Sequence, residues 1–197
     1  MLTTRDNSSL LVVDIQTRLL PQIQNAESIV AANAFLLKSA HLFKVPIVAT
    51  VQYVKGLGPT HPHLADLLAG WDVQPIEKAT FSSLQDAVCK QAVMSLDRPF
   101  VVVVGIESHV CVQQTVLDLI EEGKRPIVVR DAVSSRRVAD LETSIRRMES
   151  VGAIITSAES LAFTWCHESG TPEFKEMLGF VKEFDVARGA INTDSKK

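Results

Sequence analysis

Short apolar runs alternate along the chain with longer segments of helical periodicity. The first run covers residues 10–13, and residues 28–43 follow it with apolar side chains at helical spacing. Pro46 then introduces a second apolar run at residues 47–51. Strands that alternate with helices in this way favour a parallel sheet covered on both faces. The pattern therefore predicts a β-α-β unit at the start of the chain.

The same alternation continues to residue 184. We expect further strands over residues 73–76, 100–104, 127–129 and 153–156, and helices over residues 64–69, 82–96, 109–121, 138–150, 159–165 and 172–184. Glycines and prolines interrupt residues 56–62, which we expect to form a surface loop. The predicted fold is α/β, a three-layer α/β/α Rossmann-like sandwich around a six-stranded, mostly parallel sheet.

The length and composition of the chain fit one domain. A chain of 197 residues with 46% apolar content fills one core well and is short for two. We expect a single domain over residues 1–188, followed by a polar, flexible tail over residues 189–197.

Charge and cysteine usage exclude several classes of function. The net charge at pH 7 is -3 and no basic cluster is interleaved with aromatic residues, so we expect no nucleic-acid partner. The first residues lack the order of a signal peptide, and no apolar run approaches the roughly 18 residues that span a bilayer, so we expect no membrane association. Cys89, Cys111 and Cys166 form no C-x-x-C pair, which argues against a disulfide framework and a structural zinc site. These features predict a cytoplasmic protein.

Polar residues follow several of the predicted strands. Asp14 ends the first strand, Lys78 follows the third, Cys111 follows the fourth and Asp131 ends the fifth. The carboxyl ends of parallel strands share one edge of the sheet, where clefts form in open α/β folds. We therefore expect these side chains to gather at one edge.

Cys111 is the candidate nucleophile at this edge. We expect it in the first turn of a helix, where unpaired N–H groups and the helix dipole favour the thiolate. A thiol nucleophile needs a base, and Asp14 is presented from a buried strand. Because an isolated buried carboxylate is costly, Asp14 needs a partner. Lys78 fits as its counter-ion and as support for the thiolate.

Each of these three residues also has a purely structural interpretation. Free cysteines often fill space in a core, which would leave Cys111 without a chemical role. Asp14 would serve equally well to cap a turn. Lys78 would pair at the surface with Glu77, an interaction worth at most about 1 kcal/mol. Position in the sequence alone leaves these alternatives open.

Three motifs resemble the isochorismatase-like cysteine hydrolase superfamily. They are Val-Val-Asp-Ile-Gln around Asp14, Glu-Lys-Ala-Thr-Phe-Ser around Lys78, and Gly-Ile-Glu-Ser-His-Val-Cys-Val-Gln-Gln-Thr around Cys111. The resemblance extends over residues 10–181, nearly the whole chain. The loop at residues 52–62 and the run Asp-Ala-Val-Ser-Ser-Arg at residues 131–136 are similar to the isochorismatase-domain-containing branch.

The resemblance implies an enzyme that hydrolyses a carbon–nitrogen bond of a small, amide-like molecule through a thioester. It implies a triad of Cys111 as nucleophile, Asp14 as general base and later acid, and Lys78 as electrostatic support. It also implies a cis peptide between Ile106 and Glu107, and an oxyanion hole formed by the N–H groups of Glu107 and Cys111. Members of the superfamily are usually homo-oligomers, which implies a homo-oligomer here.

The residues that would contact the substrate adjoin the triad in sequence. We expect Gln16, Tyr53, Phe81 and His109 to line the pocket. Tyr53 and Phe81 would serve equally well in the core, and His109 would serve equally well as a solvent-facing residue at the start of a helix.

The resemblance argues against a metal. Nicotinamidases of the superfamily carry Asp and His metal ligands just after the second strand, whereas the matching positions here are Gln52 and Val54. His61 and His63 lie two residues apart in the loop, but no third ligand is apparent. We expect no metal and no cofactor.

Three other functions compete with this hypothesis. A non-catalytic or regulatory protein would keep the fold and use it as an interaction surface. A dinucleotide site is disfavoured, because Asp-Ile-Gln-Thr-Arg at residues 14–18 stands where a G-x-G-x-x-G loop is needed. Redox sensing by Cys111 requires a second cysteine nearby, which the sequence does not show.

Overall fold

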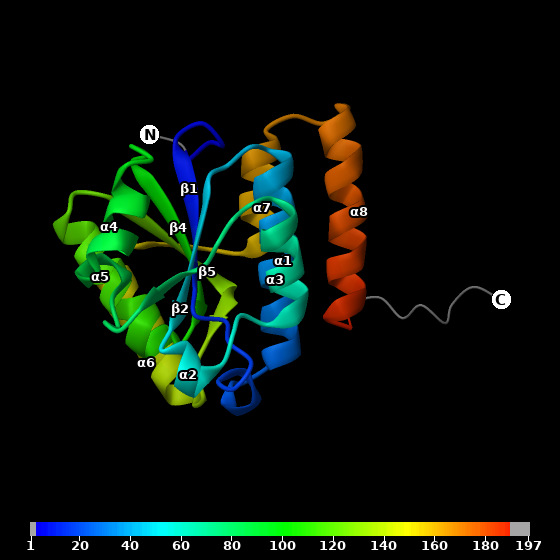
Figure 1. Cartoon of the computed structure of the whole chain (residues 1–197). Helices are drawn as coiled ribbons and strands as arrows, with labels where there is room; N and C mark the ends of the chain where they lie inside the picture. Colours follow the sequence, from blue (N-terminus) through cyan, green and yellow to red (C-terminus); the bar gives the residue numbers. More distant parts are fainter. Residues whose placement is uncertain (1–2, 190–197) are drawn as a thin grey trace.

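The computed structural model describes residues 3–189 and contains one six-stranded sheet (Figure 1). The strands are β1 (Ser8–Val13), β2 (Ile47–Gln52), β3 (Ile76–Lys78), β4 (Phe100–Ile106), β5 (Arg125–Ser134) and β6 (Ile154–Thr156). They lie in the order β3-β2-β1-β4-β5-β6, and every pairing between them is parallel. The predicted α/β sheet is confirmed.

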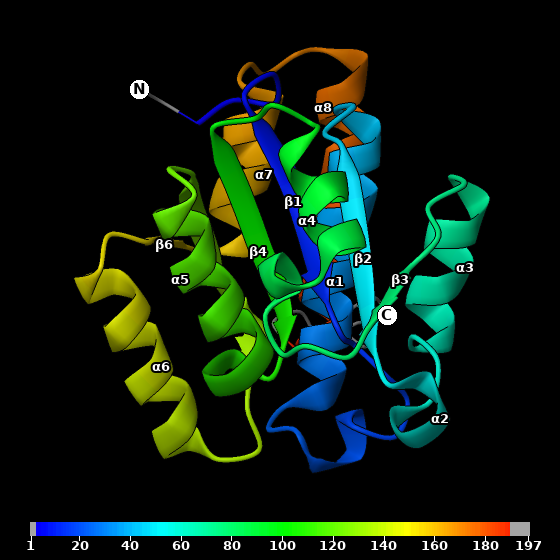
Figure 2. The same ribbon diagram turned by 60° about the vertical axis from the view of Figure 1, so that its left-hand side comes forward.

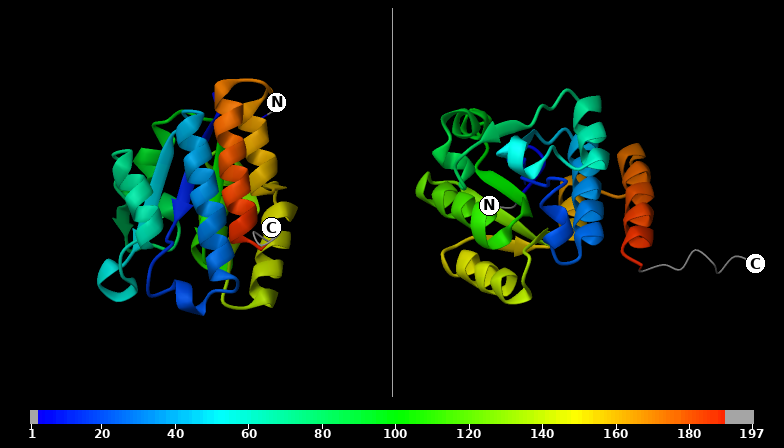
Figure 3. Two further views of the ribbon diagram at one scale, coloured as in Figure 1. Left: turned by 90° about the vertical axis from the view of Figure 1, so that its right-hand side faces the viewer. Right: turned by 60° about the horizontal axis from the view of Figure 1, so that its bottom comes forward.

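Helices cover both faces of this sheet (Figures 1 and 2). One face carries α1 (Ala26–Leu42), α3 (Pro62–Gly70), α7 (Ala158–Cys166) and α8 (Pro172–Ala187). The other face carries α4 (Ala87–Met94), α5 (Gln113–Glu121) and α6 (Val138–Ser150). A single turn, α2 (Val54–Leu57), follows β2. Figure 3 shows α8 outermost, alongside α1 and α7.

The central strands supply side chains alternately to two apolar cores. Leu10 and Val12 of β1 belong to the core beneath α1, whereas Leu11 and Val13 belong to the core beneath α5. Successive strand residues point to opposite faces, and both faces of this sheet are covered. The strands therefore appear in the sequence as continuous apolar runs.

Gly105 allows β1 and β4 to approach closely at the carboxyl edge of the sheet. Its φ is +114°, and a Cβ atom there would lie 2.0 Å from the carbonyl oxygen of Val13. A residue with a side chain would meet both the unfavourable backbone conformation and the clash. Glycine is therefore required at the point where the chain leaves β4.

The third strand starts later than its apolar residues predict. It covers Ile76–Lys78 instead of residues 73–76, and Lys78 pairs with Gln52 of β2. Because Lys78 is a buried charge at the end of the strand, a search for apolar runs does not detect it.

The fifth strand is longer than predicted. It continues to Ser134 through an irregularity in its pairing with β4, instead of ending near residue 129. Asp131 lies inside this strand, and its carboxylate accepts a hydrogen bond from the N–H of Ala158 at the start of α7. The expectation that Asp131 ends the strand at the site was wrong, because its carboxylate caps a helix.

Two predicted helices are interrupted near their first turns. Residues 82–96 form a 3-10 turn, Ser83–Gln85, and then α4, because Asp86 between them is extended and caps α4. The segment predicted as a helix over residues 109–121 begins as a short π-helix, Ser108–Val112, before α5. α3 begins at Pro62, inside the predicted loop.

The aromatic residues of α7 and α8 mainly complete the core. The fully buried Trp165 donates from Nε1 to the hydroxyl of Ser8 at 2.9 Å. Phe184 stacks on Phe35 of α1, with ring centroids 5.0 Å apart.

Of the expected tail, only Gly189 lies among the described residues. Among the helices of residues 3–189, none has the length and apolar character needed to cross a bilayer.

Candidate active site

Asp14 leaves the end of β1 in a left-handed turn. Its φ is 53°, a conformation that few residues other than glycine adopt, and its N–H donates to the carbonyl of Thr50 at 3.2 Å. The whole residue is buried. The turn and the bond to β2 fix the direction in which the carboxylate leaves the sheet.

Lys78 forms a fully buried ion pair with Asp14. Its Nζ atom lies 2.7 Å from Oδ2 of Asp14, and neither side chain is exposed. Nζ also donates to Oε1 of Gln52 at 2.7 Å and lies 3.2 Å from the carbonyl oxygens of Thr80 and Phe81. Removing two charges from water is costly, and such a pair persists where further hydrogen bonds satisfy it. The acceptors around Nζ meet that requirement.

Two side chains of β2 hold this ion pair from the side. The hydroxyl of Thr50 donates to Oδ1 of Asp14 at 2.8 Å, so both carboxylate oxygens have a donor. Gln52 donates from Nε2 to the carbonyl of Ala79 at 2.7 Å, which orients its Oε1 toward Lys78. The sequence analysis named Gln52 only as a position without a metal ligand and did not name Thr50, although a threonine and a glutamine two apart in an apolar strand are a visible signal.

Cys111 lies in the π-helix after β4 and is 7% exposed. Burial raises the pKa of its thiol to about 12, and the charge of Asp14 adds to this effect. The ammonium of Lys78 acts in the opposite direction and is outweighed. This direction is opposite to the stabilised thiolate that a position at a helix start led us to expect.

The resting site thus combines a neutral thiol with a carboxylate whose charge acts on it. A thiol of this kind becomes a nucleophile only if its proton leaves as the sulfur attacks. Cys89, Cys111 and Cys166 are all free and buried. Burial likewise raises the pKa of Cys89 to about 12.

The segment before Cys111 is anchored by Glu107. The peptide bond between Ile106 and Glu107 is cis. The Glu107 carboxylate accepts from the backbone N–H of Arg136 at 3.0 Å and from its guanidinium at 2.6 Å. Burial acts to raise the pKa of Glu107, but these hydrogen bonds and the charge of Arg136 outweigh it and hold that pKa below its ordinary value. Arg136 was not among the residues singled out from the sequence.

The family of the chain follows from comparison with known proteins. An isochorismatase domain model matches residues 8–160. The chain belongs to the isochorismatase family. Asp14, Lys78 and Cys111 all lie within the matched region.

Members of the isochorismatase family resemble this chain over most of its length. Isochorismatase domain-containing protein 2A of Mus musculus is 35% identical over 178 residues, which are 90% of this chain and 84% of that protein. The secreted isochorismatase effector Isc1 of Phytophthora sojae is 33% identical over 192 residues, which are 96% and 91% of the two chains. A solved structure of the MAR1 ribonuclease of Caenorhabditis elegans has a TM-score of 0.84 and 32% identity, and the match covers 100% of this chain and 98% of the other.

Gln16 has a structural task in this member of the isochorismatase family. Its Nε2 donates to the carbonyls of Gln52 and Gly58, and its Oε1 accepts from the N–H of Gln52. The side chain is fully buried and its amide is occupied. We expected Gln16 to face a substrate. In the structure its amide instead holds the segment after β2.

The other three expected pocket residues differ in exposure and contacts. Tyr53 and Phe81 are 57% and 55% exposed, next in sequence to Gln52 and close to Lys78. His109 pairs through Nδ1 with the hydroxyl of Ser135 at 2.9 Å.

The residues of the loop do not assemble a metal site. Within residues 3–189 no group of three or more His, Cys, Asp or Glu side chains has the arrangement to hold a metal ion. Burial and the nearby His63 lower the pKa of His61. The amide of Gln52 is used by Lys78, and Val54 offers no ligand atom.

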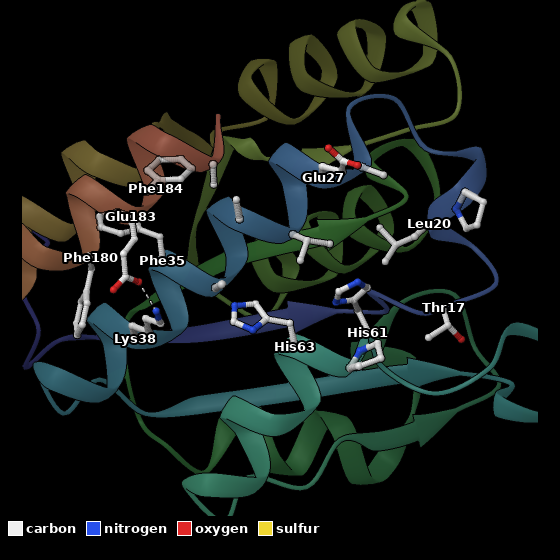
Figure 4. A pocket seen from close by; sticks show the side chains of 17 residues that line it. Thr17, Leu20, Glu27, Phe35, Lys38, His61, His63, Phe180, Glu183 and Phe184 are labelled. Atoms are coloured by element: carbon white, nitrogen blue, oxygen red, sulfur yellow. Dashed lines mark hydrogen bonds and ion pairs between the residues drawn. The ribbon is translucent and has the colours of Figure 1, made fainter. Parts of the chain in front are cut away.

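A separate apolar groove of about 670 Å³ lies on the other side of α1 from the sheet (Figure 4). It runs between α1, α8 and the start of α3, with the Lys38–Glu183 ion pair toward one end, His61 further along, and Leu20 and Thr17 toward the other end. Its lining includes none of Asp14, Lys78 and Cys111. The groove is therefore distinct from the candidate active site.

Proposed function

We propose that this protein is a cysteine hydrolase that cleaves the carbon–nitrogen bond of a small, amide-like molecule. The observation that carries the proposal is the buried Asp14–Lys78 ion pair, whose carboxylate acts on the Cys111 thiol. A buried ion pair contributes little net stability compared with apolar packing. Its position beside a buried thiol at the carboxyl edge of the sheet therefore favours a chemical role over a structural one.

In the first half of the reaction, Cys111 is acylated. Asp14 takes the thiol proton as Sγ attacks the carbonyl carbon, which forms a tetrahedral oxyanion. The N–H groups of Glu107 and Cys111 donate to that oxyanion, each worth about 3 kcal/mol in comparable sites. The carbon–nitrogen bond then breaks, Asp14 returns the proton to the departing nitrogen, and a thioester remains on Cys111.

In the second half, water hydrolyses the thioester. Asp14 takes a proton from the attacking water, and the same N–H groups hold the second oxyanion. The carbon–sulfur bond breaks and the proton on Asp14 returns to the sulfur, so the site regains its starting state. Lys78 stays bonded to Asp14 throughout and stabilises its ionised form.

The substrate contacts follow from the exposed rings. Tyr53 and Phe81 are the candidates for contact with the apolar part of the substrate. Both are more than half exposed, whereas Asp14, Lys78 and Cys111 are buried. His109 lies two residues before the nucleophile and is the candidate polar contact. Within this proposal the site works without a metal or cofactor.

The experiment is a screen of small amides that measures released ammonia or amine. Cys111→Ala is the test variant, and Cys166→Ala is the matched control because Cys166 is also free and buried. We expect Cys111→Ala to lose activity by about a thousandfold or more, whereas Cys166→Ala retains it. Full activity of Cys111→Ala would overturn the proposal.

Two other outcomes of the same screen identify competing functions. A short RNA belongs in the panel, because the structurally similar protein of Caenorhabditis elegans is named a ribonuclease. We expect no cleavage, since the chain has a net charge of -3 and no basic cluster interleaved with aromatic residues. An absence of all turnover, with an inert Cys111, would favour a non-catalytic interaction protein.

The assembly and compartment of the protein form part of the proposal. We infer a homo-oligomer from the resemblance to the superfamily, and light scattering after gel filtration tests it; a monomer at micromolar concentration would contradict it.

We infer a cytoplasmic location because three free cysteines fit a reducing compartment. Since one relative is named a secreted effector, cell fractionation is the direct test.

A further inference from the structure

β2 lies between the strand that carries Asp14 and the strand that carries Lys78. Thr50 pairs in register with Val13, the residue before Asp14, and Gln52 pairs in register with Lys78. Thr50 and Gln52 are two residues apart, so their side chains share one face of the strand. The middle strand therefore places one polar side chain against each member of the ion pair.

The two oxygens of the Asp14 carboxylate have different donors. Oδ2 accepts from the charged ammonium of Lys78 at 2.7 Å, whereas Oδ1 accepts from the neutral hydroxyl of Thr50 at 2.8 Å. A proton is less favourable on the oxygen beside an ammonium. Oδ1 is therefore the more basic of the two positions.

Thr50 is itself 2% exposed, and its hydroxyl has both a donor and acceptor capacity. A buried hydroxyl that donates to a carboxylate fixes the rotation of the carboxylate plane and draws charge from the accepting oxygen. Valine would fill the same volume in the strand without supplying the donor.

We propose that Thr50 is a positioning residue, which holds the Asp14 carboxylate so that Oδ1 takes the Cys111 proton and returns it. This inference rests on the proposed hydrolase function for its place in the reaction. The proton moves from Sγ to Oδ1 as the carbon–sulfur bond forms, and from Oδ1 to the departing nitrogen as the carbon–nitrogen bond breaks. Thr50 acts on this transfer only through Asp14.

The test uses alkylation of Cys111 by iodoacetamide, which requires no known substrate. The rate is followed at pH 8 by mass spectrometry of the peptide that carries Cys111. In Thr50→Val the Asp14 carboxylate keeps more charge near the sulfur, so we expect alkylation about threefold slower than in the unaltered protein. In Thr50→Ser the hydroxyl is retained, and we expect the rate to return to that of the unaltered protein.

A double variant separates an effect through Asp14 from a general loss of packing. In the Asp14→Asn background, Thr50→Val should leave the alkylation rate unchanged, because the charge through which Thr50 acts is gone. Equal slowing in both backgrounds would overturn the inference. So would a Thr50→Ser rate as low as that of Thr50→Val, or a Thr50→Val rate equal to that of the unaltered protein.

The same variants examine the reaction once the amide screen supplies a substrate. Thr50→Val should then lower kcat about tenfold with KM unchanged, and Thr50→Ser should restore kcat. If the hydrolase proposal fails, no amide is turned over, but the alkylation rate of Cys111 still depends on Thr50. The two failures are therefore distinguishable.

Discussion

The charge on Asp14 adds to the effect of burial on the Cys111 thiol. That charge is the second cause, after burial, of the raised pKa of Cys111. In the proposed mechanism, the carboxylate that raises the pKa of the resting thiol is also the group that accepts its proton during attack. Loss of the charge should therefore have opposite effects on simple alkylation and on turnover.

Asp14→Asn tests this opposition. Removing the charge lowers the pKa of Cys111, so iodoacetamide should modify Cys111 at pH 8 about tenfold faster than in the unaltered protein. Turnover of any amide found in the screen should be lost, because the base is gone. Slower alkylation in Asp14→Asn would contradict the account, since it would mean that Asp14 stabilises a resting thiolate.

The Glu107–Arg136 pair makes stability depend on pH in the acidic range. The pKa of Glu107 is lowered in the folded protein, so its pairing stabilises the fold above the unfolded value of about 4.3 and is lost as the pH falls through the folded value. Arg136→Met should therefore cost about 1–2 kcal/mol in urea unfolding at pH 7, a value reduced for the exposure of the guanidinium.

The unfolding free energies of Arg136→Met and the unaltered protein are also compared at pH 3. The difference between Arg136→Met and the unaltered protein should shrink there, because Glu107 is protonated more in both. In a Glu107→Gln background the substitution should show no such dependence on pH. A difference in unfolding free energy that stays constant from pH 7 to pH 3 would count against the role of this ion pair.

Candidate site residues could be predicted from the sequence only where an apolar run revealed the strand that precedes them. Asp14, Lys78 and Cys111 were all singled out because they follow apolar runs read as strands. The sequence indicated a helix start at Cys111 but not the burial that raises the pKa of its thiol. The partners of Thr50, Gln52 and Arg136 lie in segments distant in sequence, so one sequence does not show which groups they contact.

At the scale of elements, the approach of β1 to β4 depends on Gly105. Gly105→Ala should lower the free energy of unfolding by about 3 kcal/mol or more, because of both the clash and the backbone conformation. Gly179→Ala is the matched control, since nothing lies within 4 Å of its Cβ position in α8 and alanine favours helices by about 1 kcal/mol. Equal effects of the two substitutions in urea unfolding would refute this role of Gly105.

Elements with strong apolar periodicity were predicted well, and their boundaries were not. The central strands and the helices α1, α5 and α6 follow from periodicity because each buries one face or both. The splitting of residues 82–96 depends on Asp86, whose extended backbone and capping carboxylate end one turn and begin α4. The π-helix that contains Cys111 is not visible in the apolar periodicity, and such turns are common at functional sites.

At the scale of the whole molecule, the sheet order brings the three chemical residues together. β3, β2, β1 and β4 are neighbours in the sheet, so Lys78, Asp14 and Cys111 follow strands that lie side by side (Figure 2). The alternation of strands and helices predicted the layers but not this order, which depends on pairings between distant segments. The apolar groove beside α8 likewise arises from packing between α1, α3 and α8 that periodicity alone does not specify.

Acyl transfer to Cys111 tests the central claim most directly. The protein is mixed with p-nitrophenyl acetate, quenched in acid and mapped by mass spectrometry, with hydroxylamine used to distinguish thioesters from acetylated lysines. We predict a hydroxylamine-sensitive acetyl group on the peptide that carries Cys111, and none on that peptide in Cys111→Ala. Acetylation confined to other residues, or hydroxylamine-sensitive labelling that is equal in Cys111→Ala, would contradict the assignment of Cys111 as the nucleophile.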